Sequence, residues 1–319
     1  MPLIYLIVLS KHTHGIFFAC RSLNSSSTAI PSPLGSGARI ANGKKAPKGA
    51  IPFAAYIEIE SYEGIYTCGG SLIAPRVLVT AGRISIMTRT RANTAWLSIC
   101  YLNKACIPAA HCFFSDSGNS LATSALAAIG ETDISRPSRV YEILEVIRPT
   151  DYAPAFTYEL YGDIAVALLD RRANRKPVTM GSSKTKIPKY YITAGWGLTE
   201  KDYSPDELMY AAVPSLSLRQ VNSWAASSGL YYSMEEDKMA AGLGSDRADS
   251  CQGDSGGPLF IPGKDKFTNA ESRRNILMGV VSYGLSSACG GRNRNIGFYT
   301  SIPYWRNWIK DAISSNKWK

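Results

Sequence analysis

From residue 51 onward, short hydrophobic runs rich in β-branched and aromatic residues recur between clusters of turn-forming residues. In some of them, such as FAAYIEIE, apolar and polar positions alternate, which is typical of a half-buried strand. Many short strands separated by turns predict an all-β sandwich or barrel. The predicted strands are 53–60, 69–73, 76–81, 139–147, 163–169, 190–197, 276–284 and 296–302.

One convincing helical pattern stands near the C-terminus, in PYWRNWIKDAISS. Pro303 suits the first turn of a helix, where its missing N–H is not needed. Apolar side chains recur every three or four residues, so they share one face of the helix. We expect this face to pack, and the tryptophans to have no part in chemistry; its members are Trp305, Trp308, Ile309, Ala312 and Ile313.

Residues 1–39 differ in composition from the rest of the chain. Their longest apolar run, MPLIYLIVLS, is too short to cross a bilayer, so no transmembrane helix is expected. The region is interpreted as a leader, either a secretory signal or misassigned start, or else a disordered extension. The Ser, Pro and Gly content of residues 21–39 is typical of a flexible linker, and folded structure is expected to begin near Ile40.

Composition and charge narrow the range of possible functions. With 319 residues, of which 45% are hydrophobic, the chain is long enough to bury one large core or two modest ones. Its net charge of +10 raises the possibility of a nucleic-acid partner, but the basic residues are scattered apart from small groups such as RRANRK (171–176). A solvated basic surface is therefore the preferred interpretation, and no nucleic-acid partner is expected.

The most specific string in the chain is DSCQGDSGGPL, which surrounds Ser255. Its G-x-S-x-G core fits both the nucleophile elbow of α/β-hydrolases and a serine-protease loop. In an α/β-hydrolase the histidine follows the serine. Here all three histidines precede it, and His12 and His14 lie in the leader, which leaves His111 as the base available to the folded body.

In this order of histidine, aspartate and serine, the chain resembles the trypsin-like (chymotrypsin-fold) serine proteases over residues 39–316. The resemblance implies two six-stranded antiparallel β-barrels and a C-terminal helix in a peptidase domain of residues 40–316. That domain follows a leader and activation peptide, 1–39, and precedes a tail, 317–319. The matching motifs are RIANG (39–43), CGGSLI (68–73), AAHC (109–112), GDIAVALL (162–169), AGWG (194–197), CQGDSGGP (251–258), VSYG (281–284) and GFYT (297–300).

The resemblance also implies a catalytic triad. Ser255 is expected to be the nucleophile, His111 the general base and Asp163 the carboxylate that orients the imidazole. Asp163 could instead be a turn residue at a strand start, but the apolar run that follows it favours the triad role. Asp151 and Asp170 are the alternative carboxylates.

The same resemblance implies how the protein is activated and how it binds the oxyanion. Arg39–Ile40 resembles a zymogen cleavage site, where cutting frees an amino group that pairs with Asp254 beside the serine. This pairing would organise the oxyanion hole, which the resemblance assigns to the backbone amides of Gly253 and Ser255. An ordinary linker arginine is the alternative reading of Arg39.

Substrate selection is predicted from a carboxylate six residues before the serine. The resemblance places Asp249 at the floor of the primary pocket, where it would favour Lys or Arg before the scissile bond. A surface charge without such a role is the alternative. Tyr283 departs from the family, which has tryptophan there. The expected substrate-binding residues are Asp249, Ser282, Gly284 and Gly297.

Cysteine positions agree with the resemblance. The implied disulfides are Cys68–Cys112 and Cys251–Cys289. Both suit an oxidising compartment and a secreted protein. A third family pairing is absent at both of its ends, where Val221 and Ala240 stand.

Residues 82–109 interrupt the family motif V-T-A-A-H-C directly before the histidine. Glycine codons begin GG and alanine codons begin GC, so an intron starting inside the Gly82 codon and ending inside the Ala110 codon would restore the motif when spliced. We therefore interpret 82–109 as a translated intron or gene-model artefact. The alternative is a genuine insertion, with a Cys100–Cys106 bridge.

Together these features predict a serine endopeptidase, made as a zymogen, that cleaves after Lys or Arg. The expected partners are peptide or protein substrates, an activating trypsin-like protease and protein inhibitors, with no membrane partner. No cofactor or metal is expected, because Arg136 and Arg139 enter the loop after Glu131 where the family binds calcium. A catalytically impaired homologue with a binding role is the alternative function.

Overall fold

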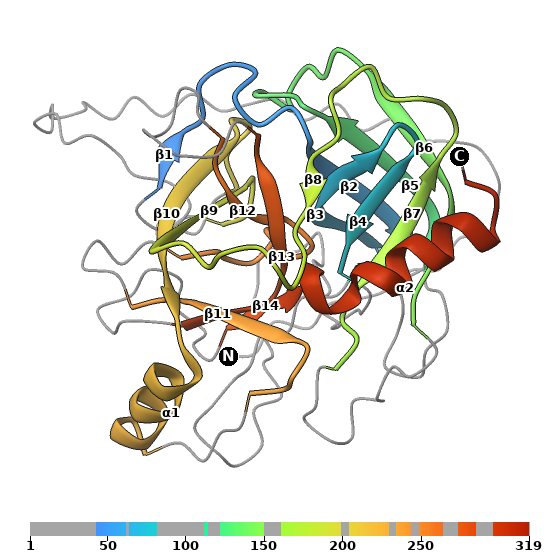
Figure 1. The fold of residues 1–319 in the computed structure, drawn as a ribbon. Helices are drawn as coiled ribbons and strands as arrows, with labels where there is room; N and C mark the ends of the chain where they lie inside the picture. Colours follow the sequence, from blue (N-terminus) through green and yellow to red (C-terminus); the bar gives the residue numbers. More distant parts are fainter. Residues whose placement is uncertain are drawn as a thin grey trace, which may run out of the picture. The chain divides into compact units, whose positions relative to one another are not determined.

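The computed structural model describes residues 43–61, 64–81, 112–113, 122–149, 161–198, 204–229, 234–243, 249–263, 274–284 and 296–318. Within these ranges the strands form two closed antiparallel barrels (Figure 1). The first barrel has the strand order β2-β3-β4-β7-β6-β5. Its strands are β2 (Ala54–Ser61), β3 (Gly64–Ala74), β4 (Val77–Thr80), β5 (Ala122–Ile129), β6 (Val140–Ile147) and β7 (Ala165–Leu169).

The second barrel is a ring of six strands that closes because β9 pairs with both β10 and β12. Its strands are β9 (Tyr190–Gly195), β10 (Met209–Leu216), β11 (Lys238–Gly242), β12 (Pro258–Ile261), β13 (Ile276–Gly284) and β14 (Ile296–Ser301). Two short strands extend it: β1 (Lys44–Lys45) pairs with β10, and β8 (Thr179–Met180) runs parallel to β13. The predicted pair of six-stranded barrels is confirmed.

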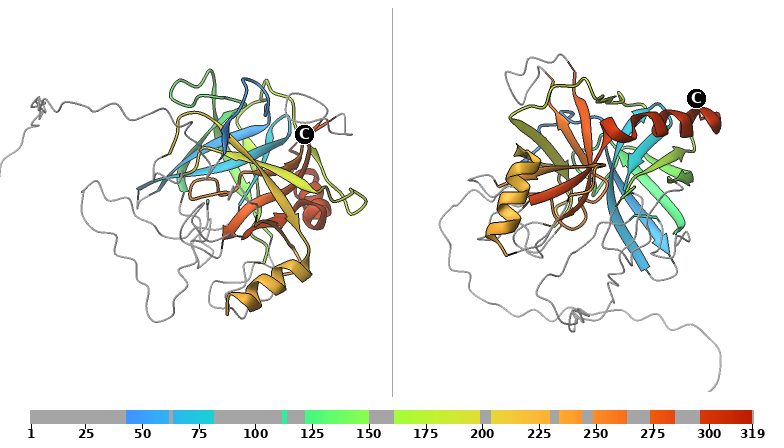
Figure 2. Two further views of the ribbon diagram at one scale, coloured as in Figure 1. Left: turned by 90° about the vertical axis from the view of Figure 1, so that its left-hand side faces the viewer. Right: turned by 60° about the horizontal axis from the view of Figure 1, so that its bottom comes forward.

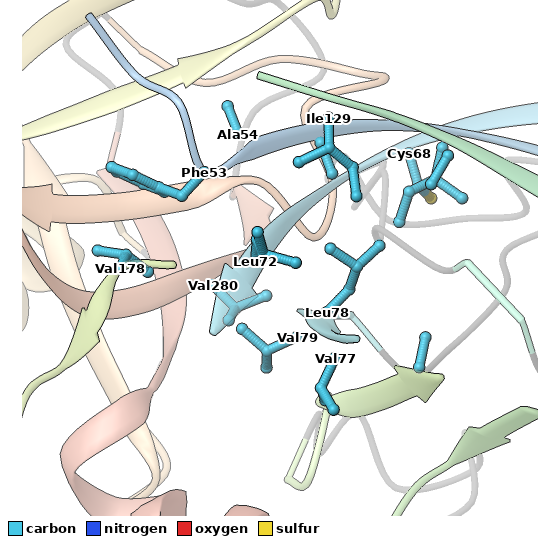
Figure 3. Close-up of a cluster of buried hydrophobic side chains, with 14 of the residues drawn as sticks. Phe53, Ala54, Cys68, Leu72, Val77, Leu78, Val79, Ile129, Val178 and Val280 are labelled. Carbon is cyan, nitrogen blue, oxygen red and sulfur yellow. The ribbon is translucent and has the colours of Figure 1, made fainter. Parts of the chain in front are cut away.

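The interior of the first barrel follows directly from its sequence pattern. In β2 the isoleucines Ile57 and Ile59 are fully buried, whereas the alternating glutamates Glu58 and Glu60 are exposed. Figure 3 shows the side chains of Leu72 and Leu78 converging with those of neighbouring strands. The two barrels meet where Phe53 packs edge-on against Phe260, with ring centroids 5.2 Å apart.

The C-terminal helix α2 (Ile302–Ser315) lies against β13 of one barrel and β7 of the other (Figures 1 and 2). Ser301 caps its N-terminus, and Trp305, Ile309 and Ala312 are buried as the apolar face predicts. A helix that the sequence pattern did not indicate, α1 (Leu218–Ser227), follows β10. It begins with a capping box between Ser217 and Gln220, a signal that was present in the sequence as S-x-x-Q.

Candidate active site

Asp163 lies between a tight turn and β7, and it is 1% exposed. Its Oδ2 accepts a hydrogen bond of 2.5 Å from the hydroxyl of Ser282, and its backbone carbonyl accepts one of 2.7 Å from Thr300. This buried carboxylate is therefore held at both its side chain and its backbone. Thr300 is missing from the predicted site, although it ends the GFYT motif.

Ser255 occupies a turn that is fixed against the first barrel. Its carbonyl accepts a 2.6 Å hydrogen bond from the amide of Gly69 in β3. The next residue, Gly256, has a φ of +81°, and a Cβ there would lie 2.2 Å from the hydroxyl of Thr80. Only glycine combines this left-handed backbone with so close an approach. The shape of this turn therefore requires glycine at position 256.

One strand holds both the serine turn and the carboxylate. Val281 of β13 accepts from the amide of Gly256 and donates to the carbonyl of Gly257, each at 2.9 Å. The next residue along the strand, Ser282, donates to Asp163. Consecutive residues of β13 thus fix the relative placement of Ser255 and Asp163.

His111 lies outside the described residues, but its sequence neighbour Cys112 is described. Cys112 forms a disulfide with Cys68 in β3, with a Cα–Cα distance of 6.0 Å. Its sulfur lies 3.7 Å from the carbonyl oxygen of Ser255 and 3.8 Å from the hydroxyl of Thr80. The residue after the predicted base is therefore anchored beside the serine turn.

Three of the residues predicted for the primary pocket, Asp249, Gly284 and Gly297, also come together. Asp249 is 6% exposed, and a Cβ built at Gly297 would lie 3.2 Å from its Oδ1. Gly297 in β14 is the register partner of Gly284 in β13. Burial and, secondarily, the negative charge of Asp249 raise the pKa of Tyr299, whose hydroxyl lies 3.3 Å from that of Ser250. The phenol beside the carboxylate therefore stays neutral.

Tyr283, which stands where the family has tryptophan, is held by two contacts. Its ring stacks on Phe298 with centroids 4.8 Å apart, and its hydroxyl donates to Glu235 at 2.8 Å. The same buried cluster includes Val221 and Ala240, the two residues at the positions of the absent disulfide. Apolar packing occupies the place that this disulfide has in the family.

The carboxylate of Asp254 is buried and accepts backbone hydrogen bonds of 2.8 Å from Gly197 and from Cys251. Burial is the main effect on this group and raises the pKa of Asp254 to about 6. A Cβ at Gly195 would lie 2.2 Å from its Oδ1, so the AGWG motif leaves space for the carboxylate. Gly253, the predicted oxyanion donor, precedes Asp254 and has a φ of +91°.

Several predicted residues lie outside the described ranges: Arg39, Ile40 and Cys289, together with all of 82–109. Cys251 is disulfide-bonded. In the part of the chain that the structure describes, no three His, Cys, Asp or Glu side chains are grouped to hold a metal ion. The helices described there include none with the length and apolar character needed to span a membrane.

Solved structures show the same fold. Neuropsin, a serine protease expressed in the limbic system of mouse brain, superposes with a TM-score of 0.60 at 24% identity, covering 86% of this chain and 99% of that one. HL collagenase gives a TM-score of 0.61 at 20% identity, with 86% and 98% covered.

The curated relatives that match are longer than this chain. Transmembrane protease serine 11G of Mus musculus is 29% identical over 87% of this chain and 56% of its own length. Phenoloxidase-activating factor 3 of Holotrichia diomphalia is 26% identical over 86% of this chain and 72% of its own. The chain spans about half the length of the first of these relatives. The family model described as Trypsin matches residues 100–309, and the chain therefore belongs to the trypsin family of serine proteases.

Proposed function

We propose that the protein is a serine endopeptidase in which Ser255, His111 and Asp163 form the catalytic triad. The observation that carries this proposal is the attachment of the Ser255 turn and the Asp163 carboxylate to consecutive residues of β13. The disulfide that anchors Cys112, the neighbour of His111 in the chain, beside that turn supports the third member.

Each residue has a defined part in the proposed reaction. The Ser255 hydroxyl attacks the scissile carbonyl while His111 takes its proton and later returns it to the leaving amine. Asp163 stabilises the imidazolium, and the hydrogen bond from Ser282 keeps its carboxylate in place. The amides of Gly253 and Ser255 would stabilise the oxyanion, and each such donor is typically worth about 3 to 4 kcal/mol.

For specificity, we propose that Asp249 selects Lys or Arg before the cut. Support comes from its low exposure and from the glycine pair, Gly284 and Gly297, at its side. Without side chains, these two positions leave room for a long cationic group, and a buried carboxylate stabilises such a group by a charge-assisted hydrogen bond.

The protein is proposed to be a zymogen that is activated by cleavage after Arg39. The burial of Asp254 supports this, because burial disfavours a negative charge and raises the pKa of this carboxyl. The ammonium group freed on Ile40 would bring a positive charge to this carboxylate and favour its ionised form. An activating protease with the same preference for arginine would suit this site.

The decisive experiment compares uncleaved and Arg39-cleaved protein on an arginyl amide substrate. We expect turnover only after cleavage, with a norleucyl substrate of similar length hydrolysed far more slowly. The variant Ser255→Ala, cleaved in the same way, controls for a contaminating protease. A cleaved, folded protein that leaves every substrate intact would instead support the impaired, binding homologue.

We also propose that residues 82–109 are not needed for this activity. Thr80 and Cys112 stand 32 positions apart in the sequence, yet their side chains are 3.8 Å apart. Joining the flanking segments directly would therefore leave the described strands undisturbed. We expect a chain lacking 82–109 to fold and to be at least as active as the full chain. Mass spectrometry of the native protein that detects a peptide containing Trp96 in active enzyme would contradict the intron interpretation.

Localisation follows as a further proposal. The Cys68–Cys112 disulfide suits an oxidising compartment. We propose secretion, with peptide or protein substrates and protein inhibitors as partners.

A further inference from the structure

A fully buried ion pair lies outside the proposed triad. Nζ of Lys238 is 2.7 Å from Oδ1 of Asp237, and both side chains are completely inaccessible to solvent. Lys238 opens β11, a strand whose other residues are Met, Ala, Ala and Gly. Burying two charges is costly, and an apolar pair of similar volume often gives equal or greater stability. A contribution to stability alone is therefore a weak explanation for this pair.

The second oxygen of Asp237 reaches the turn that precedes the triad carboxylate. Oδ2 accepts from the amide of Gly162 and from the indole of Trp305, each at 2.9 Å. The carbonyl of Asp237 accepts a 2.7 Å bond from the amide of Ser301, the cap residue of α2. This one residue thus connects β11, the start of α2 and the peptide next to Asp163.

Gly162 is the position where the backbone changes direction. It is buried, its φ is +74°, and Asp163 follows it immediately. Asp163 is held from its other side by Thr300, which is the register partner of Lys238 in the β11–β14 pairing. Asp237 and Lys238 therefore both lie next to the segment that carries the Asp163 carboxylate.

We propose that Asp237, with Lys238 as its counter-ion, is a positioning residue for Asp163. This inference rests on the proposed function and extends it from the triad to the buried residue that orients Asp163. A carboxylate is suited to the task because it has acceptor sites for all three donors at once. The Lys238 ammonium holds one oxygen, and the other oxygen then faces the amide of Gly162.

The test compares two neutral replacements of the pair that are similar in shape, of which one keeps an acceptor oxygen and the other has none. D237N/K238M keeps an oxygen that can face Gly162, whereas D237L/K238M has a methyl group there and leaves no buried charge. With an arginyl amide substrate, we expect kcat of activated D237L/K238M to fall by about ten- to a hundred-fold, since small misplacements have effects of this size. KM should change little, and the acid limb of the pH profile should shift, because a displaced Asp163 stabilises the imidazolium less well. D237N/K238M should stay close to the unaltered protein.

Trp305→Phe is the matched control, because it removes the other donor to the same oxygen and leaves the Gly162 bond. It should lower the thermal midpoint without moving kcat or the pH profile. If D237L/K238M showed only a lower midpoint, with kcat and pH profile unchanged, the positioning role would be wrong. D237S/K238M, whose hydroxyl is too short to reach Gly162, serves the same comparison if the leucine variant does not fold.

An activity-independent measurement separates this inference from the proposed function. If the activated, unaltered protein hydrolyses nothing, the proposed peptidase function fails. Amide exchange at Gly162 then tests the placement alone. Much faster exchange in D237L/K238M than in D237N/K238M and Trp305→Phe supports it, and equal exchange in all three overturns it.

Discussion

The two barrels share a topology but differ in what they bury. Inside the described strands of the first barrel, the buried polar residues are the hydroxyl-bearing Ser71 and Thr80. Among the described residues, the second barrel and the loops between its strands bury four acidic or basic side chains: Asp237, Lys238, Asp249 and Asp254. Asp163, the buried charge contributed by the first barrel, lies just before β7 and outside its strands.

This difference indicates that the two barrels have different roles. The first barrel has an apolar interior, and the Ser255 turn is hydrogen-bonded to this barrel through Gly69. The second barrel buries charged groups. Such groups destabilise a fold unless they are paired or hydrogen-bonded. Substitutions in the second barrel should therefore alter chemistry more than folding, and those in the first should do the reverse.

The sharpest contrast is expected at the nucleophile. Ser255→Ala should reduce kcat by about 10⁴-fold or more, because the remaining groups cannot form an acyl-enzyme. Its midpoint of urea denaturation should be close to that of the unaltered protein, since the Gly69 bond goes to the backbone carbonyl. Burst kinetics with an active-site titrant measure the loss. Residual turnover above one hundredth of the original rate would argue for another nucleophile.

Asp249→Ser should separate specificity from catalysis. Losing the partner of a desolvated cation typically costs about 2 to 5 kcal/mol, so kcat/KM for arginyl substrates should fall by the corresponding factor. Substrates with a neutral residue before the cut should be hydrolysed at least as well as before. Equal losses on both kinds of substrate would mean that Asp249 supports the fold and does not select the substrate.

The first barrel should respond in the opposite way. Leu72→Ala removes a fully buried side chain and should lower the free energy of unfolding by about 2 to 5 kcal/mol. Below its denaturation midpoint, kcat should be unchanged. Ile65→Ala in the same strand is the control, because Ile65 is 60% exposed and should shift stability by less than about 0.5 kcal/mol. A large fall in kcat for folded Leu72→Ala would contradict the proposal that the two barrels have different roles.

How far the sequence predicts the molecule also differs by region. Runs with β-branched or aromatic residues identify β2, β6 and β13, whereas alanine-rich β5 has weak strand propensity and is formed by its neighbours. Motif residues such as Ser255, Asp163 and Asp249 can be found because their chemistry requires their spacing. Asp237 cannot, because its bonds to Gly162 and Trp305 join segments that are distant in sequence.

The smallest expected effect is a pH dependence at Asp254. Its pKa is about 6 in the folded, uncleaved protein and 3.8 when unperturbed, so the unfolded chain loses this proton first as pH rises. Between about pH 4 and pH 6 the folded state therefore binds more protons, and the free energy of unfolding falls with rising pH. A shift of roughly two units corresponds to at most about 3 kcal/mol, complete above pH 6.

Urea denaturation of uncleaved protein in a Ser255→Ala background, which prevents self-digestion, measures this loss across pH 4 to 7.5. Asp254→Asn is the control and should remove the Asp254 contribution, while other titrating groups affect both proteins alike. In Arg39-cleaved protein the sign should reverse, because the freed amino group stabilises the ionised carboxylate and lowers its pKa. The same fall in stability before and after cleavage would show that the new amino group does not reach Asp254, and the activation proposal would then be wrong.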